Sequence, residues 1–174
     1  MASVPYFAYG SNMLTERLRA RCNSVTTRCL ASADEYRLAF SKKSRDGSGK
    51  ATIRPDEAFR VYGVVFDLNE TELLALDEAE GAGSGYDRVE NFKVHADGLN
   101  GALDVVTYIA SPGYTDPEFK PYDWYLKLVV AGARQHGLPP QYVDEIEAVQ
   151  SIPDPKPNRE SRLEALKLLG GQPE

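Results

Sequence analysis

The sequence predicts an α+β domain built on a mixed sheet. Short apolar runs that are typical of strands occupy much of the chain up to residue 110. Amphipathic segments with helical spacing follow from residue 121 onward. Strands that come mostly before helices, with two helical segments interspersed among them, indicate this fold class.

The first elements are a short buried strand, a polar turn and a helix. Residues 5–9 form an apolar run, which predicts the strand. A Gly-Ser-Asn turn at residues 10–12 interrupts the run, and the helical spacing of residues 13–21 predicts a helix. Ser11 or Asn12 is expected to cap this helix.

The central part of the chain combines further strands with one helix. Strands are predicted at residues 36–40, 51–53 and 61–68, of which the last is apolar enough to be buried on both faces. Residues 42–50 are rich in Ser, Gly and charge, so we expect a mobile loop there. A helix is predicted to about residue 80, with Asn69 as its cap and Glu72 as the capping-box partner.

A hairpin and two helices follow. Residues 86–95 and 102–110 are predicted to pair around a turn that contains two glycines. Pro121 suits the first turn of a helix that runs to residue 136, and Pro140 suits the start of another.

The chain is predicted to divide at a proline-rich break. We assign residues 1–152 to one domain. Residues 153–174 are interpreted as a linker and a short amphipathic helix that packs on the same domain.

Composition narrows the classes of function. A chain of 174 residues can bury the core of one domain. Its net charge of -6 argues against a nucleic-acid partner, because phosphate-binding surfaces are basic. No apolar run approaches the ~18 residues of a membrane span, and no secretory signal is visible, so we expect a cytoplasmic protein without a membrane partner. Cys22 and Cys29 are expected to be free thiols, although a single disulfide is the alternative.

The turn at residues 10–12 is the first candidate binding site. Free amides at a helix start point toward a bound anion, with the positive end of the helix dipole behind them. Gly10 allows backbone angles that are closed to other residues. The alternative is an ordinary strand-to-helix turn, and the local pattern leaves both interpretations open.

Glu80 is the second candidate. Helical spacing places Leu73, Leu76 and Glu80 on one stripe, with Asp77 near its edge. An inward carboxylate needs a partner or takes up a proton, and a raised pKa suits a general base near neutral pH. The alternative is that Glu80 curls out to solvent from the last turn. The carboxylates off the stripe are expected to be solvated, namely Glu70, Glu72 and Glu78.

Three blocks of the chain resemble the gamma-glutamylcyclotransferase family, in the same order and over roughly residues 5–150. They are Tyr-Gly-Ser-Asn-Met with Leu-Thr-Glu-Arg at residues 9–17, Gly-Val-Val-Phe at 63–66 followed by Leu-Asp-Glu-Ala-Glu-Gly at 76–81, and Tyr125 with the glycines of 132–139. The resemblance implies that the mixed sheet curls into a partial barrel with flanking helices, the gamma-glutamylcyclotransferase-like fold.

The resemblance also implies an activity. Family members of this kind cyclise the gamma-glutamyl group of a small substrate to 5-oxoproline and release an amino acid or amine, without a metal or cofactor, in glutathione metabolism. It implies that Glu80 is the catalytic acid/base and that Tyr125 contacts substrate, with Tyr86 as a further candidate. The substrate-binding segment that it implies consists of Tyr6, Phe7, Ala8, Tyr9, Gly10, Ser11 and Asn12.

Other functions are less well supported. A non-catalytic small-anion binding module would keep the turn at residues 10–12 but would gain nothing from an inward Glu80. Ser11 lacks the Gly-x-Ser-x-Gly elbow of a serine hydrolase, and His95 and His136 lie far from it in sequence. Two histidines without clustered ligands disfavour a catalytic zinc site. The sequence leaves the leaving group and the oligomeric state open, with a homodimer as one alternative.

Overall fold

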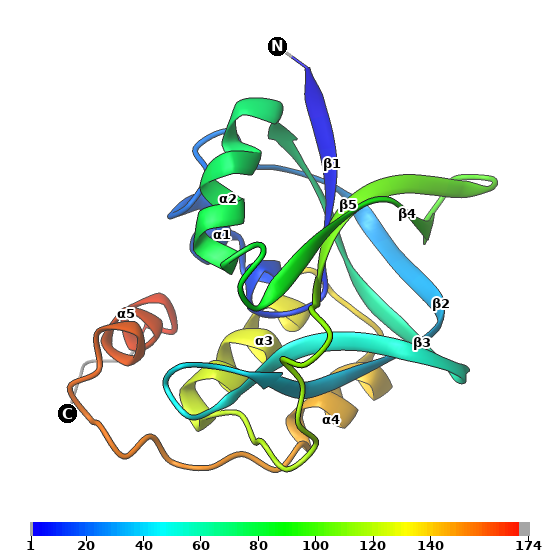
Figure 1. Ribbon diagram of the computed structural model, residues 1–174. Coiled ribbons are helices and arrows are strands. Elements are labelled where there is room, and N and C mark those ends of the chain that lie inside the picture. The colour runs from blue at the N-terminus through cyan, green and yellow to red at the C-terminus, as the bar shows by residue number, and fades with distance from the viewer. Residues whose placement is uncertain (1, 171–174) are drawn as a thin grey trace.

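Five strands form a closed barrel in the computed structural model, which describes residues 2–170 (Figure 1). Met1 and residues 171–174, the end of the predicted C-terminal segment, lie outside this part. The strand order is β1-β3-β2-β4-β5. The pairing of β1 with β5 is parallel, and the other pairings between neighbours are antiparallel. The predicted mixed sheet curled into a barrel is thereby confirmed. The strands are β1 (Ser3–Ala8), β2 (Thr26–Lys43), β3 (Gly49–Asn69), β4 (Tyr86–Ala96) and β5 (Ala102–Ala110).

The β2–β3 hairpin joins segments that the sequence predicts as separate. The predicted strands at residues 51–53 and 61–68 are parts of β3, and the predicted loop at residues 42–50 is the tight end of the hairpin. Residues 54–60 of β3 are mostly exposed, so this stretch shows no apolar alternation that would reveal a strand. Register shifts along β2 bend the long pair around the barrel.

A single glycine allows β1 and β3 to approach closely. A Cβ atom at Gly63 would lie 2.4 Å from the carbonyl oxygen of Ala8 and 2.6 Å from the ring of Phe7. Phe7 and Phe66 are both fully buried, and because Phe66 pairs with Tyr6 while Phe7 pairs with Val65, their side chains lie on opposite faces of the sheet. The apolar run that contains Gly63 is therefore buried on both faces, as its composition predicts.

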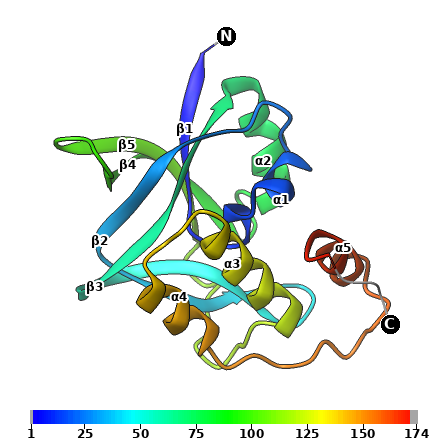
Figure 2. The same ribbon diagram turned by 180° about the vertical axis from the view of Figure 1, so that it is seen from behind.

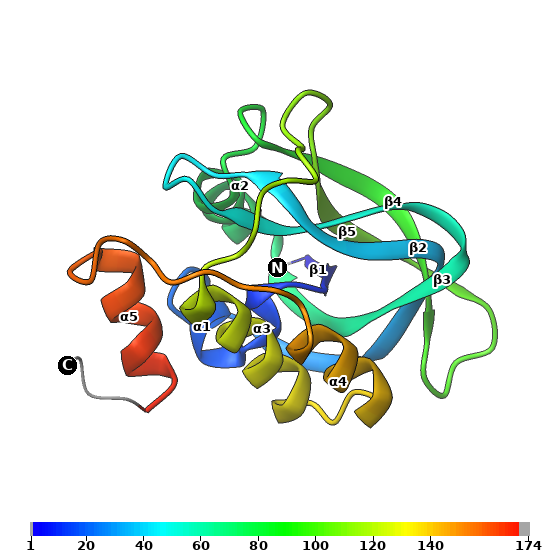
Figure 3. The ribbon, with the colours of Figure 1, turned by 90° about the horizontal axis from the view of Figure 1, so that it is seen from below.

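Helices cover one side of the barrel. In Figure 2, α3 and α4 lie in front of the long β2–β3 pair, and Figure 3 shows α3 between α4 and α5. A Cβ atom at Gly132 of α3 would lie 2.5 Å from the backbone nitrogen of Leu14, so α3 presses directly on the turn that follows β1. No helix in the described chain has the length and apolarity to cross a bilayer. The helices are η1 (Ser11–Met13), α1 (Thr15–Arg19), η2 (Glu70–Glu72), α2 (Leu73–Glu80), α3 (Asp123–Gln135), α4 (Pro140–Glu147) and α5 (Glu160–Leu168).

Both predicted helix caps are wrong. The predicted helix at residues 13–21 begins as a single 3-10 turn and continues as the short α1, and neither Ser11 nor Asn12 caps it. Asn69 makes no side-chain cap either. The Glu72 carboxylate instead accepts hydrogen bonds from the backbone amides of Asn23, at 2.6 Å, and Ser24. Polar side chains near these helix starts hold distant segments together, so they are not available as local caps.

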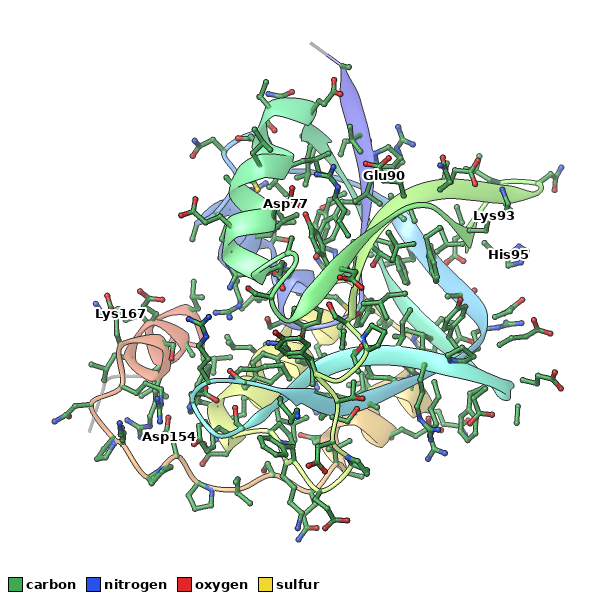
Figure 4. The ribbon with its side chains drawn as sticks, viewed as in Figure 1. Asp77, Glu90, Lys93, His95, Asp154 and Lys167 are labelled. Atoms are coloured by element: carbon green, nitrogen blue, oxygen red, sulfur yellow. The ribbon has the colours of Figure 1, made fainter. Side chains whose placement is uncertain are left out.

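Asp154 attaches the C-terminal segment to α3. Its carboxylate accepts hydrogen bonds from Trp124 Nε1, at 3.0 Å, and from Arg159 Nε, at 2.7 Å. Burial opposes its ionisation, but these bonds outweigh burial and lower the pKa of Asp154 to about 2. Figure 4 shows Asp154 in the segment that leads to α5, and Ala165 of α5 is fully buried.

We expect Gly63→Ala to destabilise the barrel, because its new methyl group must push β1 away from β3. Overpacking of this kind costs about 1–3 kcal/mol of unfolding free energy. Urea unfolding, followed by the fluorescence of Trp124, the single tryptophan, measures the loss. Ala58→Val adds bulk at an exposed position of the same strand and should change stability by less than about 0.5 kcal/mol. Equal effects of the two substitutions would show that the close approach is unimportant.

Candidate active site

The predicted binding turn and Glu80 line the same pocket. The pocket has an empty volume of about 320 Å³, which includes open solvent at its mouth. Ala51 and Tyr108 complete the pocket but were not predicted, because they come from strands whose sequences carry no motif. The lining residues are Tyr6, Tyr9, Gly10, Ser11, Asn12, Ala51, Glu80, Tyr86, Tyr108 and Tyr125.

Phe7 and Ala8 belong to the core and do not line the pocket. Phe7 is fully buried and stacks on Phe92 across the barrel, with ring centroids 6.4 Å apart. Ala8 is buried where β1 pairs with β3. The family resemblance marks the whole segment, but only some side chains of a strand can face one site.

Glu80 points toward the barrel from the last turn of α2. Its Oε1 accepts hydrogen bonds from Asn12 Nδ2, at 2.8 Å, and Arg21 Nη1, at 2.7 Å. Its side chain is 16% exposed. Gly81 takes the left-handed conformation, with φ of 64°, and ends the helix directly after Glu80. Of the two orientations that the sequence leaves open, the structure shows the inward one.

The second oxygen of Glu80 is available to a bound molecule. Within residues 2–170, the hydrogen bonds of this carboxylate are made by Oε1 alone. Because Glu80 also lines the pocket, Oε2 can meet a ligand without breaking an existing contact.

Asp77, the rival carboxylate, has both of its oxygens engaged. Oδ1 accepts a hydrogen bond from the Tyr108 hydroxyl at 2.6 Å, and Oδ2 pairs with Arg88 at 2.7 Å. Figure 4 shows Asp77 on α2, and it does not line the pocket. We interpret Asp77 as a residue that positions Tyr108.

Gly10 keeps the pocket open by its small size. Its φ is −111°, so the turn does not use the positive angles that favour glycine. A Cβ atom at Gly10 would lie 3.0 Å from the Ala51 methyl group and 3.6 Å from the Tyr125 hydroxyl. The expected role of Gly10 in backbone freedom is therefore wrong, and close approach explains the glycine.

The amides of the turn are free to bind an anion. In the part of the chain that the structure describes, the N–H groups of Gly10, Ser11 and Asn12 have no hydrogen-bond acceptor. The following 3-10 helix has only three residues, which is too short for a substantial dipole. Anion binding at this turn would rest on the amides themselves.

The side chains of the turn hold the site together. Asn12 donates to the Tyr6 hydroxyl at 3.1 Å and to Glu80, and its Oδ1 accepts from Arg21 at 2.9 Å. Ser11 Oγ accepts a hydrogen bond from Arg17 Nε at 3.0 Å. Two arginines from the segment after the turn thus fix its polar side chains.

The tyrosines of the pocket remain protonated. Burial raises the pKa of Tyr125 and of Tyr86. The Tyr125 oxygen accepts a hydrogen bond from the Ala51 amide at 3.1 Å, and the Tyr86 hydroxyl donates to the Ala51 carbonyl at 2.6 Å. Because its oxygen already accepts a bond, Tyr125 can donate its proton to a bound molecule.

The histidines lie away from the pocket. His136 contacts Thr15 Oγ1 at 3.0 Å and packs edge-on against Phe66. His95 is exposed near the far end of β4 (Figure 4) and lies 3.5 Å from Asp34. Neither lines the pocket with Ser11. Across residues 2–170, no group of three His, Cys, Asp or Glu side chains is placed to hold a metal ion.

Lysines at the pocket were not predicted. Lys50 lies 4.5 Å from the ring centroid of Tyr125 and 3.1 Å from Asp46. Burial lowers the pKa of Lys50 to about 8, although Asp46 opposes this effect. Lys50 lies in the segment that the sequence predicts as a mobile loop, so no fixed position was expected for its side chain.

Comparisons with known proteins agree with this architecture. The model of the AIG2-like family matches residues 60–146. A gamma-glutamylcyclotransferase from Homo sapiens is 34% identical over 150 residues, which cover 83% of this chain and 78% of that protein. The Mus musculus protein of the same name is 33% identical with the same coverage. A solved structure named gamma-glutamyl cyclotransferase superimposes with a TM-score of 0.83 at 31% identity, covering 95% of this chain and 99% of the other.

The lowered pKa of Lys50 predicts a pH-dependent stability. Lys50 is charged up to about pH 8 in the folded state but up to about pH 10.5 when unfolded. Unfolding therefore takes up a proton between these two pH values. The amount by which the buried charge of Lys50 lowers the unfolding free energy consequently decreases as the pH rises. The unfolding free energy of Lys50→Met minus that of the native protein should fall by roughly 2 kcal/mol between pH 7 and 9.5. Lys43→Met is the control, and parallel stability curves for Lys50→Met and the native protein would contradict the prediction.

Proposed function

The chain belongs to the gamma-glutamylcyclotransferase family, and from this premise we propose that it is an enzyme that converts gamma-glutamyl amino acids or amines to 5-oxoproline with Glu80 as general acid/base. One observation carries the proposal: a half-buried carboxylate with a free oxygen lies in a small pocket beside three free backbone amides. The reaction joins two groups of one molecule, so the site must supply orientation and proton transfer.

Substrate binding follows from the charges of the site. The amides of residues 10–12 would hold the α-carboxylate of the gamma-glutamyl group or the oxyanion that develops on its γ-carbonyl. The Tyr125 hydroxyl would donate a further hydrogen bond to the substrate. Glu80 would face the α-ammonium group, to which its carboxylate is attracted.

The reaction then proceeds by three proton transfers, and Glu80 carries out the first two. Glu80 takes a proton from the α-ammonium group, and the neutral amine attacks the γ-carbonyl carbon to form the five-membered ring. The protonated Glu80 gives its proton to the leaving nitrogen, the bond between that nitrogen and the γ-carbon breaks, and 5-oxoproline and the free amine are released. The ring nitrogen carries two hydrogens after the attack and loses one of them as a proton to the departing amine, which leaves in its ammonium form. Atoms and charges then balance, and Glu80 returns to its starting state.

Arg21 would prepare Glu80 for the first transfer. The Arg21–Glu80 ion pair is 2.7 Å long and largely withdrawn from solvent, and this charge-assisted hydrogen bond fixes the position of the carboxylate at the pocket. Asn12, which lies in η1, donates a hydrogen bond to the same oxygen, Oε1 of Glu80. Both contacts leave Oε2 as the atom that exchanges the proton.

Free thiols support a cytoplasmic location. Cys22 and Cys29 are both unpaired, and burial raises the pKa of Cys22 to about 11, which keeps it an unreactive thiol. Unbridged cysteines are typical of a reducing compartment.

Glu80→Gln tests the role of the carboxylate. The amide keeps the shape of Glu80 but cannot carry a proton between nitrogens, and general acid–base catalysis typically contributes about 100- to 10,000-fold. We expect kcat for 5-oxoproline formation from gamma-glutamyl-alanine to fall at least ~100-fold. Circular dichroism should show an unchanged fold.

Glu78→Gln is the matched control, because Glu78 is an exposed glutamate on the same helix. Its activity should stay near that of the native enzyme, and an N-acetylated substrate should be inert because its nitrogen is no longer nucleophilic. Near-native turnover by Glu80→Gln would overturn the proposed mechanism. A native protein that binds 5-oxoproline but forms none from any substrate would instead be a non-catalytic binding module.

Tyr125→Phe tests the hydrogen bond to substrate. It removes one hydroxyl and little volume, so kcat/KM should fall by the equivalent of about 0.5–1.5 kcal/mol. The Ala51 amide also loses its acceptor, so thermal unfolding is measured in parallel to separate a binding effect from lost stability. Unchanged kinetics would assign Tyr125 to core packing alone.

A further inference from the structure

A groove that lies apart from the pocket follows the free edge of β2. Within residues 2–170, β2 pairs with β4 only at Ala31 and Ser32, so the later residues of β2 have a strand partner on one side alone, which is β3. Five consecutive residues of β2, at positions 37–41, line the groove, and the segment between β5 and α3 forms its other wall. A groove lined in this way runs along the edge of the strand.

The segment between β5 and α3 begins to pair with this edge and then leaves it. The Lys43 amide donates a hydrogen bond to the Tyr114 carbonyl at 2.8 Å, and the Asp116 amide donates one to the Ser41 carbonyl at 2.8 Å. Pro117 follows and has no amide hydrogen with which to continue the ladder. Figures 1 and 3 show this segment passing across the β2–β3 hairpin on its way to α3. The pairing along the edge of β2 thus stops at Ser41.

The ladder with β3 shows which backbone groups point to the free edge. Ala51 of β3 turns its amide and carbonyl groups away from β2, because both bond to the hydroxyl groups of pocket tyrosines. The direction alternates along a strand, so Ile53 and Pro55 also point away from β2, which suits a proline. Their partners in β2 are Leu38 and Tyr36, whose own N–H and C=O groups consequently face the open edge. In the described chain these groups have no backbone partner.

Positive charge and apolar side chains line the groove together. Arg37, Arg54 and Lys120 line it, and no carboxylate of the described residues does. Arg54 and Lys120 take part in no ion pair within residues 2–170, and the ion pair of Arg37 is 4.0 Å long. Phe40 and Phe119 are apolar members of the lining. The net charge of the whole chain is -6, so the positive charge is a local property of this groove.

We propose that the free edge of β2 binds an extended acidic segment of a partner protein, which adds a strand beside residues 36–39 and places its carboxylates against the three cations. Main-chain hydrogen bonds to a strand edge give a complex of this kind its affinity, and the flanking side chains give it specificity. The inference is independent of the reaction proposed above, because the groove and the pocket share no lining residue.

Other uses of the edge fit the groove less well. Twofold pairing of β2 with a second copy of this chain would bring the three cations of each copy together, and like charges across an interface are unfavourable. Cations on a strand edge can also serve only to prevent pairing. That role does not explain why Phe40 and Phe119 line the same groove, and an edge of that kind would bind no acidic peptide.

A labelled peptide tests the proposed binding. The probe is fluorescein-Glu-Val-Asp-Val-Glu-Val-amide, whose alternating pattern suits a strand, and fluorescence anisotropy measures its binding to the native protein. We expect a Kd below about 1 mM that rises with added salt. A peptide with lysine in place of each acidic residue should bind at least ~10-fold more weakly.

Two further peptides test the strand geometry. One carries N-methyl groups on the amides of its acidic residues, and the other carries them on the amides of its valines. A peptide that adds to an edge uses every second amide, so one of the two should bind at least ~10-fold more weakly than the other.

Arg54→Glu assigns the binding to the groove. The substitution reverses a charge at an exposed position and should raise the Kd of the acidic peptide at least ~10-fold. Arg19→Glu is the matched control, because Arg19 is an exposed arginine of α1 that does not line the groove, and its Kd should equal that of the native protein. Circular dichroism should show that both variants keep the native fold.

Several results would overturn the inference and leave the proposed function intact. They are a failure of the acidic peptide to bind, equal binding of the lysine peptide, and an unchanged Kd in Arg54→Glu. Tighter binding of a single-stranded oligonucleotide than of the peptide would show instead that the groove recognises phosphate. A native dimer that Arg54→Glu converts to a monomer in sedimentation would make the groove an interface between copies of this chain, which also contradicts the inference.

Discussion

The contact of Glu80 with Asn12 and Arg21 is the interaction on which the site depends. It joins the end of α2 to the segment after β1, which lies 68 residues away from Glu80 at Asn12. A carboxylate withdrawn from water is costly unless it is paired and hydrogen-bonded, and both requirements are met on one oxygen. The other oxygen remains open to the pocket, so the network both stabilises the charge and presents it.

The barrel provides the rigid support for this contact. Gly63 lets β1 lie close against β3, and Gly132 lets α3 press on the backbone that follows Met13. The turn at residues 10–12 is consequently held from two sides, and its residues line the pocket. A third glycine, Gly10, leaves the space that a side chain would fill. The backbone is thus closely packed around the turn, while the missing side chain of Gly10 leaves the pocket open beside it.

The pocket combines neutral donors with separated charges. Buried tyrosines whose pKa values are raised by burial line the pocket, and Arg17, Arg21 and Lys50 contact lining residues from outside that set. Neutral hydroxyl groups can orient a small bound molecule by hydrogen bonds without adding charge beside the reacting atoms.

The sequence by itself determined the fold class, most element positions and the two principal site candidates. Apolar runs, helical spacing and the Tyr-Gly-Ser-Asn and Leu-Asp-Glu-Ala-Glu-Gly motifs are local patterns, and a local pattern can be recognised from neighbouring residues. The residue spacing also placed Glu80 on the stripe of its helix that faces the core. It left open whether the side chain points inward or curls out to solvent. The cap at Asn12 and the capping box at Glu72 were mispredicted because distant partners, Glu80 and Ser24, use these polar groups.

Only the tertiary structure decided the orientation of Glu80, the closure of the barrel and the full membership of the pocket. Arg21, Lys50 and Tyr108 reach the site from separate elements, and nothing in their neighbouring residues marks them. Their roles depend on distances between segments that are far apart in the chain. Such distances are set by the closing of the barrel and by the close packing of its glycines, which no local pattern encodes.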